Sequence, residues 1–354
     1  MAEAERVGAG AGGARVSGAG EVVDAVVAGG GPTGAAAAIV LARAGMRTVL
    51  LEAGDGRAVK VGEALPPAAA PVLRDLGVSA DDLRADGHLP SYGNVATWGS
   101  DEPYAVDFLR DPNGHGWHVD RARLEALLRT RAVAAGADVR LSSPARLVAG
   151  PSPWTITTPG GGELTARAFV DATGRRAALA RVLGARRERL DRLVAVYADV
   201  AAPPGDADAR TFLRAAEHGW WYTALAPGGR RVTALLTDAD LLPRALRTPA
   251  DFAAAHGARL SAVAGPGWAA AGDAALACDP LSSQGILTAL VTGIHAAEAL
   301  TGDALPAHAV RLRDIAAAYA RNRAATYGFE RRWPSSPFWA RRLAAAPAPA
   351  PAPA

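Results

Sequence analysis

The sequence is nearly free of two residue types that often carry redox chemistry or charge. It has one cysteine, Cys278, and Lys60 is the only lysine among 38 basic residues. A single cysteine excludes a disulfide within the chain and suits a reducing compartment, so the cytoplasm is the expected location. No apolar run approaches the roughly 20 residues that a membrane span needs, so no membrane span is expected.

Strong net charge is absent as well. The 354 residues include 38 basic and 35 acidic side chains, which gives a formal net charge of +3. This near balance does not indicate nucleic acid as a partner. No cluster of residues has metal-ligand spacing, so no metal site is expected. The length suits one large domain or two interleaved domains.

The most informative stretch runs from Asp24 to Glu52. It begins with Ala25–Ala28, an apolar run without polar alternation that is typical of a parallel strand buried on both faces. Gly29, Gly31 and Gly34 follow with the G-x-G-x-x-G spacing. In that pattern the first glycine permits a tight turn, the second lets the backbone approach a pyrophosphate, and the third allows close packing of helix on strand.

The rest of this stretch completes a nucleotide site. A helix is expected over Ala35–Arg43, ended by Gly45, and its free N–H groups point at the phosphates. A second strand is expected over Thr48–Leu51. Glu52 lies 18 residues after Gly34, where a carboxylate can accept hydrogen bonds from both ribose hydroxyls. A carboxylate there favours FAD or NAD over NADP.

Further elements follow from local patterns along the chain. Apolar spacing predicts three more helices, over Val72–Leu76, after a cap at Asp120, and from Ser283 to about Leu300. Alternation predicts a hairpin within Tyr92–Phe108, a β-rich stretch over Leu193–Leu236, and strands over Trp154–Thr158, Glu163–Thr165, Ala168–Asp171 and Trp268–Ala271.

The order of these elements predicts an α/β fold, in which a Rossmann-like nucleotide-binding domain is interleaved with a β-rich substrate domain. The first domain is expected over residues 21–85, 113–190 and 262–342, and the second over 86–112 and 191–261. Residues 1–20 are expected to be a disordered leader, and 343–354 an extended Ala/Pro tail.

Three separated motifs, AGGGPTG with Glu52, VDATG and AGDAALACDPLSSQGI, together resemble the FAD-dependent monooxygenase and halogenase superfamily with the p-hydroxybenzoate hydroxylase type of fold. The resemblance covers about residues 22–342. It implies FAD as the cofactor, bound in a GR2-type domain. In that family a Gly-Asp pair, matched here by Gly272 and Asp273, binds the ribityl chain and pyrophosphate side of FAD.

The same resemblance implies residues near the flavin ring. The Pro280 turn brings a helix N-terminus, with Gly285 and Ile286, to the pyrimidine edge of the flavin, where it stabilises negative charge on the reduced ring. Arg121 in GWHVDR matches an arginine near the FAD phosphates. A surface ion pair with Glu125, four residues on, is an equally good interpretation of Arg121.

One branch of the superfamily, the tryptophan halogenases, has a W-x-W-x-I-P element that GWWYTALAP resembles. The residues that carry halogenation are different here. Lys60 lies before the Gly62-Glu63-Ala64 loop and not after it, and Ser282 stands where the halogenases have their catalytic glutamate. Halogenation is therefore the second choice.

The closer resemblance is to halogenase-like single-chain flavin enzymes implicated in maturing the quinone cofactors of amine oxidoreductases. They share GWWY, GWHxDR, DPLSSQGI and a terminal ERRWPxSxFWxRR, which spans Glu330–Arg342 here. The stretch between Leu242 and Trp268 looks short for these enzymes.

This resemblance implies an FAD-dependent monooxygenase that hydroxylates an aromatic small molecule, or a peptidyl or carrier-bound aromatic group, through a flavin C4a-hydroperoxide. The setting it implies is specialised metabolism or the maturation of a peptide or cofactor. No second glycine-rich nucleotide motif is visible, so electrons are expected from transiently docked NAD(P)H or from reduced flavin supplied by a reductase. The alternatives are a halogenase, an FAD-dependent reductase or dehydrogenase, and a degenerate FAD-binding partner.

Three residues are the predicted catalytic groups. His118 and His218 are chosen for proton transfer, because a neutral imidazole can take a phenolic proton near pH 7. Trp221 is expected against the substrate. Each of these residues has an alternative role in the core. Further aromatic wall candidates are Trp98, Trp220 and Tyr222.

An arginine-rich segment follows the VDATG motif. Arg175–Arg192 holds seven arginines. A solvated helical face is the favoured interpretation, and a dock for an acidic carrier protein or leader peptide is the alternative.

Overall fold

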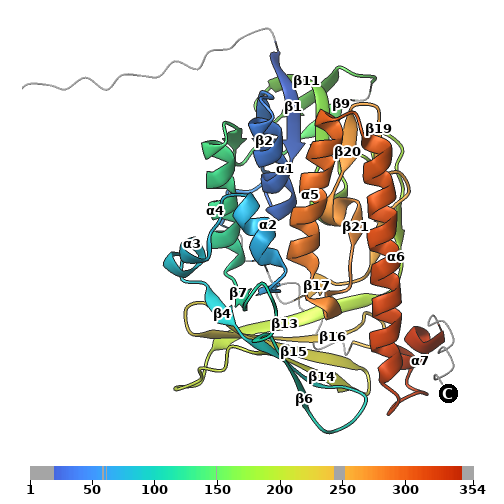
Figure 1. The fold of residues 1–354 in the computed structure, drawn as a ribbon. Helices are drawn as coiled ribbons and strands as arrows, with labels where there is room; N and C mark the ends of the chain where they lie inside the picture. The colour runs from blue at the N-terminus through green and yellow to red at the C-terminus, as the bar shows by residue number, and fades with distance from the viewer. Residues whose placement is uncertain (1–19, 58–59, 61, 149, 243–251, 345–354) are drawn as a thin grey trace, which may run out of the picture.

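The computed structural model describes residues 20–57, 60, 62–148, 150–242 and 252–344 (Figure 1). The predicted leader, apart from Gly20, and residues 345–354 of the predicted tail lie outside this part of the chain. So do residues 243–251 of the short stretch noted above. In the described part no helix is both long and apolar enough to cross a bilayer.

The nucleotide-binding domain is organised by an eight-stranded sheet. Along its main path the strands are β19 (Ala264–Gly265), β20 (Trp268–Ala270), β11 (Gly162–Asp171), β1 (Glu21–Ala28), β2 (Thr48–Leu51) and β8 (Asp138–Arg140). From β20 to β8 these strands run parallel. The antiparallel strands β10 (Trp154–Thr158) and β9 (Arg146–Val148) join at β11.

Both faces of this sheet are covered, which explains the unbroken apolar run of β1. Ala25 and Val27 face one core, against α1 (Pro32–Arg43). Val26 and Ala28 face a second core that contains Phe169 and Trp268. On the α1 side, α4 (Arg121–Ala134) and α5 (Gly285–Thr301) flank α1 (Figure 1). The predicted parallel strand is therefore buried on both faces, as expected.

The second domain, which the sequence analysis predicts as the substrate domain, contains a seven-stranded sheet. Its strands, in spatial order, are β17 (Phe252–Ala254), β13 (Leu193–Ala201), β16 (Arg230–Asp238), β15 (Gly219–Ala226), β14 (Thr211–Ala216), β5 (Gly93–Thr97) and β6 (Tyr104–Asp107). One face carries a third core, in which Trp220 of β15 packs with Tyr327 of α6 (Leu305–Phe329) and Trp339 of α7 (Pro337–Ala344). Helix α6 reaches from the first domain to this sheet (Figure 1).

Two further sheets have three strands each. One orders β3 (Ala64–Leu65), β7 (Gly116–His118) and β4 (Leu89–Ser91), and the other orders β12 (Arg187–Arg189), β18 (Ala258–Leu260) and β21 (Leu276–Ala277). The short helices α2 (Ala69–Asp75) and α3 (Ala80–Ala85) follow β3 along the chain. Each of these sheets pairs strands that are distant in the sequence, so backbone hydrogen bonds join separate segments of the interleaved chain.

The fold class is confirmed, and several local predictions need correction. Residues 163–165 and 168–171 belong to one strand, β11, because both parts pair in register with β1. Residues 175–192 do not form one helix; they contain a short 3-10 turn at Gly174–Arg176 and strand β12. Helix α7 extends to Ala344, two residues into the range predicted as tail. The sequence analysis also missed α6.

Candidate functional site

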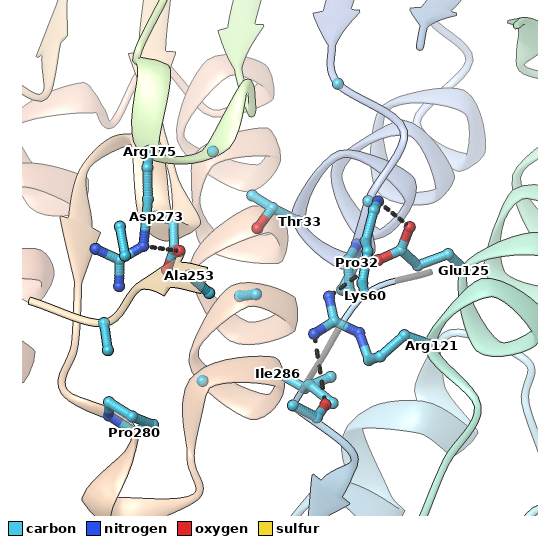
Figure 2. Close-up of a pocket in the computed structure, with 18 of the residues that line it drawn as sticks. Pro32, Thr33, Lys60, Arg121, Glu125, Arg175, Ala253, Asp273, Pro280 and Ile286 are labelled. Carbon is cyan, nitrogen blue, oxygen red and sulfur yellow. Dashed lines mark hydrogen bonds and ion pairs between the residues drawn. The ribbon is translucent and has the colours of Figure 1, made fainter. Parts of the chain in front are cut away.

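A cavity of about 830 Å³ lies between the glycine motif and the inner face of the seven-stranded sheet. It is lined by Gly29 and Glu52 at the nucleotide end and by Trp220 and Tyr222 at the sheet end. Figure 2 shows Arg175 and Asp273 on one side and Lys60, Arg121 and Glu125 on the other. The two domains thus enclose one space.

The glycines of the motif bring strand and helix into close contact. Gly29 has φ +107°, and a Cβ on Gly34 would lie 1.7 Å from the Gly29 carbonyl oxygen, so neither position accepts a side chain without strain. Gly31 is different, because a Cβ there would meet only a Glu125 oxygen at 4.0 Å. Gly29 and Gly31 line the cavity, whereas Gly34 supports it from behind.

Glu52 lies at the end of β2, as the spacing predicts. Its Oε2 accepts the N–H of Gly30 at 2.5 Å, and its Oε1 accepts the N–H of Gly54 at 3.0 Å. These two bonds fix the carboxylate at the nucleotide end of the cavity, beside the N-terminus of α1.

The Gly272-Asp273 pair lies at the same end of the cavity, next to α5. Gly272 has φ +56°, and a Cβ there would lie 2.1 Å from Thr33 Oγ1. This close approach explains why glycine is required beside α1. The Asp273 carboxylate lies 3.5 Å from Arg175 Nε, and Arg187 Nη1 donates to its backbone oxygen at 2.9 Å. Asp273 and Arg175 line the cavity, and Gly272 lies behind it.

Arg121 makes the predicted ion pair with Glu125, but the pair is buried and not on the surface, and a place near the FAD phosphates stays a prediction. The Arg121 guanidinium lines the cavity, and Nη2 also donates to Glu125 Oε1 at 2.9 Å. Lys60 Nζ binds the other oxygen of Glu125 at 2.5 Å. Arg129 Nη1 lies 4.0 Å from the same oxygen, so three cations surround one buried carboxylate.

The Pro280 turn is held from below by a buried carboxylate. Asp279 accepts hydrogen bonds from the Leu281 N–H at 2.9 Å, the Tyr327 hydroxyl at 2.8 Å and Arg323 Nε at 3.2 Å. Burial raises the pKa of Asp279, and the Arg323 charge opposes that rise. The turn leads into α5, and Pro280, Gly285 and Ile286 all line the cavity.

The structure does not bring the three predicted catalytic residues to this cavity. His118 is fully buried in β7, where Nε2 lies 2.9 Å from Thr211 Oγ1, and burial lowers its pKa to about 4. His218 is exposed in the turn between β14 and β15. Trp221 is 43% exposed and lines a second groove, which Tyr222 also lines, but Trp221 does not line the cavity. These placements correct the site prediction, because register and burial, not residue type, decide which side chains face the cavity.

Residues that the sequence analysis did not select as catalytic face the cavity instead. Tyr222 was predicted only as a wall, and it lines the cavity together with Tyr197 and Glu63. The Tyr222 hydroxyl donates to Glu63 Oε2 at 3.5 Å. The alternation of β15 was a usable signal, because Trp220 and Tyr222 share a face that Trp221 does not.

The nucleotide end of the cavity fits FAD. Its backbone is exposed where Gly29 and Gly31 leave no side chain, and the α1 N-terminus has no side-chain cap at Gly31. Uncapped N–H groups at a helix N-terminus bind phosphate well. Glu52 also lines this end, and Arg121, Arg175 and Arg176 supply positive charge. Among the described residues no cluster of three or more metal-ligating side chains is found.

Comparison with known proteins gives the family. A model described as an FAD binding domain matches residues 22–219, more than half of the chain, and the chain belongs to this family. It is an FAD-dependent oxidoreductase of the monooxygenase and halogenase superfamily that its motifs resemble. A protein of Marinomonas mediterranea named as an FAD-dependent oxidoreductase, LodB, is 29% identical over 92% of this chain and 98% of its own length.

Two solved structures share the fold. The myxobacterial chondrochloren halogenase CndH has a TM-score of 0.82 at 22% identity, over 91% of this chain and 86% of that one. The peptidyl tryptophan dihydroxylase QhpG has a TM-score of 0.74 at 25% identity, over 90% of this chain and 78% of that one.

Proposed function

We propose that this oxidoreductase is a monooxygenase that hydroxylates an aromatic group carried by a peptide or a carrier protein. The observation that carries the proposal is the single cavity, which runs from the glycine motif to the aromatic inner face of the sheet. The similarity to QhpG, named as a peptidyl tryptophan dihydroxylase, supports a peptidyl substrate. A free aromatic small molecule is the simpler alternative.

Bound FAD, once reduced, supplies the activation of O2 that oxygen transfer requires. The residues of this chain bind and orient the substrate and keep water away, which oxygen transfer needs. The inner face of the seven-stranded sheet forms the floor of the cavity, and three of its lining residues are small: Ala195, Ala234 and Ala253. On the neighbouring strands, Tyr197 and Tyr222 pair with Ala234 from either side. A floor of alanine between two tyrosines suits a flat aromatic ring.

Halogenation is less well supported by the site residues. Lys60 is bound to Glu125 at the cavity wall. Ser282 ends a short 3-10 helix at the position where halogenases have a glutamate. The lysine and the glutamate that halogenases use are therefore not at the corresponding positions of this chain.

The electron donor and the compartment are also proposals. NAD(P)H or a flavin reductase supplies the electrons, and the single cysteine favours the cytoplasm. A role in specialised metabolism or in peptide or cofactor maturation fits the same reaction.

An isotope experiment tests the proposal. The FAD-loaded protein is reduced without air by NADH, NADPH or a flavin reductase, and ¹⁸O2 is then added with tryptophan-containing peptides or with phenols. A product heavier by one or two ¹⁸O atoms is expected. Flavin reoxidation without ¹⁸O in any product contradicts monooxygenation, and chloride- or bromide-dependent products indicate a halogenase.

A further inference from the structure

We propose that Glu63 and Tyr222 form the proton-transfer pair of this cavity. The Glu63 carboxylate accepts the proton that an aromatic substrate loses, and the Tyr222 hydroxyl holds the carboxylate in place. This inference rests on the proposed function and names the residues that serve it. It also assigns the proton transfer that the sequence analysis gave to His118 and His218, neither of which lines the cavity.

The pair is built from two distant parts of the chain. Glu63 precedes β3, and its backbone oxygen accepts the Val119 N–H at 2.9 Å. Its side-chain Oε1 accepts the Gly62 N–H at 3.0 Å, and Oε2 accepts the Tyr222 hydroxyl at 3.5 Å. Glu63 is 5% exposed, and both side chains line the cavity. Catalytic hydrogen bonds are often long before substrate binds.

Four other carboxylates line the cavity, and each already has a defined set of partners. Glu52 accepts two backbone N–H groups, and Glu125 has three cations within 4.0 Å. Asp273 faces Arg175, and Asp279 binds a hydroxyl, an N–H group and Arg323.

Glu63 differs from Glu125, Asp273 and Asp279, which each have a cation within 4.0 Å, and from Glu52, which lies at the nucleotide end of the cavity and not beside Tyr222. The two hydrogen-bond donors to Glu63 are neutral, and within the described ranges no cation lies within 4.0 Å of its oxygens. Each carboxylate oxygen has more than one acceptor site. Glu63 can therefore accept a further proton from the cavity.

The electrostatics of the pair agree with these roles. Burial raises the pKa of Glu63, Arg121 opposes the rise and Asp199 adds to it. A base with a raised pKa holds a proton more firmly, which suits proton transfer near neutral pH. Burial, and then the nearby Glu63 charge, raise the pKa of the Tyr222 phenol well above its usual range. The phenol therefore stays protonated and serves as a donor.

The step balances as an aromatic hydroxylation. One oxygen atom of O2 forms a bond to a ring carbon, and the other leaves as water, with two electrons supplied by reduced FAD. The same ring carbon then loses its hydrogen as a proton. The C–H electron pair returns to the ring, and the proton goes to the Glu63 carboxylate.

Infrared spectroscopy of the holoprotein tests the pair without turnover. A carboxylic-acid C=O band that titrates with pH is expected in the wild type and should be absent from Glu63→Gln. In Tyr222→Phe the midpoint of this band should move to higher pH, because the carboxylate loses a donor that stabilises its charged form. Glu102→Gln, at an exposed position, is the matched control and should keep the band. A wild-type spectrum with no Glu63-dependent band overturns the proposal.

Turnover gives the second measurement. Glu63→Gln should lower kcat for hydroxylation about 100- to 10,000-fold, and Glu63→Asp should recover part of that loss. FAD affinity and melting temperature should stay close to the wild-type values. Unchanged hydroxylation by Glu63→Gln overturns the pair and leaves the proposed function standing. A wild-type protein that incorporates no oxygen into any substrate overturns the proposed function itself.

Discussion

The Asp279 carboxylate accepts a hydrogen bond of 2.8 Å from the Tyr327 hydroxyl, 48 positions further along the chain. The same hydroxyl accepts the Trp220 Nε1–H at 3.1 Å. Through this one oxygen atom, the turn that presents Pro280 to the cavity is joined to the inner face of the substrate sheet. Helix α6 therefore aligns the two halves of the site.

Removing that oxygen should destabilise the protein. Tyr327→Phe keeps the ring contacts in the third core but leaves the buried Trp220 Nε1–H without its acceptor and removes one of the three donors to Asp279. The expected cost is about 1–3 kcal/mol in the free energy of unfolding. Urea denaturation measures this difference. Tyr104→Phe, at a tyrosine that is 51% exposed, should change stability little. Equal free energies of unfolding for the two variants would mean that the hydrogen bonds of the Tyr327 hydroxyl do not stabilise the fold.

Alanine substitutions at two motif glycines should separate folding from FAD binding. Gly34→Ala places a Cβ 1.7 Å from the Gly29 carbonyl oxygen, so a large drop in melting temperature is expected. Gly31→Ala has room for its Cβ, so the apoprotein should melt normally. Its methyl group would occupy the path of the phosphates, and FAD titration should show at least tenfold weaker binding. Tight FAD binding by Gly31→Ala would argue against the assigned phosphate position.

A larger side chain at Ala234 should block the substrate and spare the cofactor. This residue is flanked by Tyr197 and Tyr222 on the cavity floor. Ala234→Leu should therefore raise KM for an aromatic substrate at least tenfold while FAD affinity remains unchanged. Thr233→Val, next in sequence but lining the second groove, is the control. A similar KM for both variants would mean that the substrate does not bind beside Ala234.

Buried His118 should make stability depend on pH. Its pKa is lowered from 6.5 to about 4 by burial, so the unfolded chain binds this proton more readily than the folded one. The stabilising effect is complete above about pH 6.5 and is lost as pH falls toward 4. Between pH 7 and 5 the loss from this residue is about 2 kcal/mol.

Urea midpoints at pH 7 and 5 check this prediction. His118→Gln should lose less stability over this range than the wild type. The pKa of His256 is also lowered to about 4, chiefly by burial, so part of the acid sensitivity should remain in the variant. An identical pH dependence for both proteins would mean that His118 is not held neutral by the fold.

The nucleotide half of the site could be predicted because its residues are close in sequence. One β-α-β unit contains Gly29, Gly31 and Glu52, and the strand expected over Thr48–Leu51 is β2. Gly272 and Asp273 lie far away in the chain, and only the family resemblance pointed to them.

The substrate half could not be predicted in the same way. A shift of one residue along β15 separates Trp221, on the outer face, from Tyr222, on the inner one, and the sequence does not say which face is covered. Glu63 and Tyr222 are 159 positions apart. Their contact depends on how the two domains meet.

Helix α6 shows a similar limit. Its buried residues face different surroundings along its length, since Leu312 packs in a core of the nucleotide-binding domain and Tyr327 in the core of the substrate domain. A helix with changing partners has no single apolar stripe, and periodicity does not reveal it.

The most direct test of the account is the visible absorption spectrum of the purified protein after loading with FAD and removal of free flavin. One FAD per chain is expected, with a spectrum that differs from free flavin because the cavity would bury the flavin ring away from water. Gly31→Ala should retain much less flavin than the wild type under the same conditions. A wild-type protein that retains no flavin would contradict the assignment of this cavity as an FAD site.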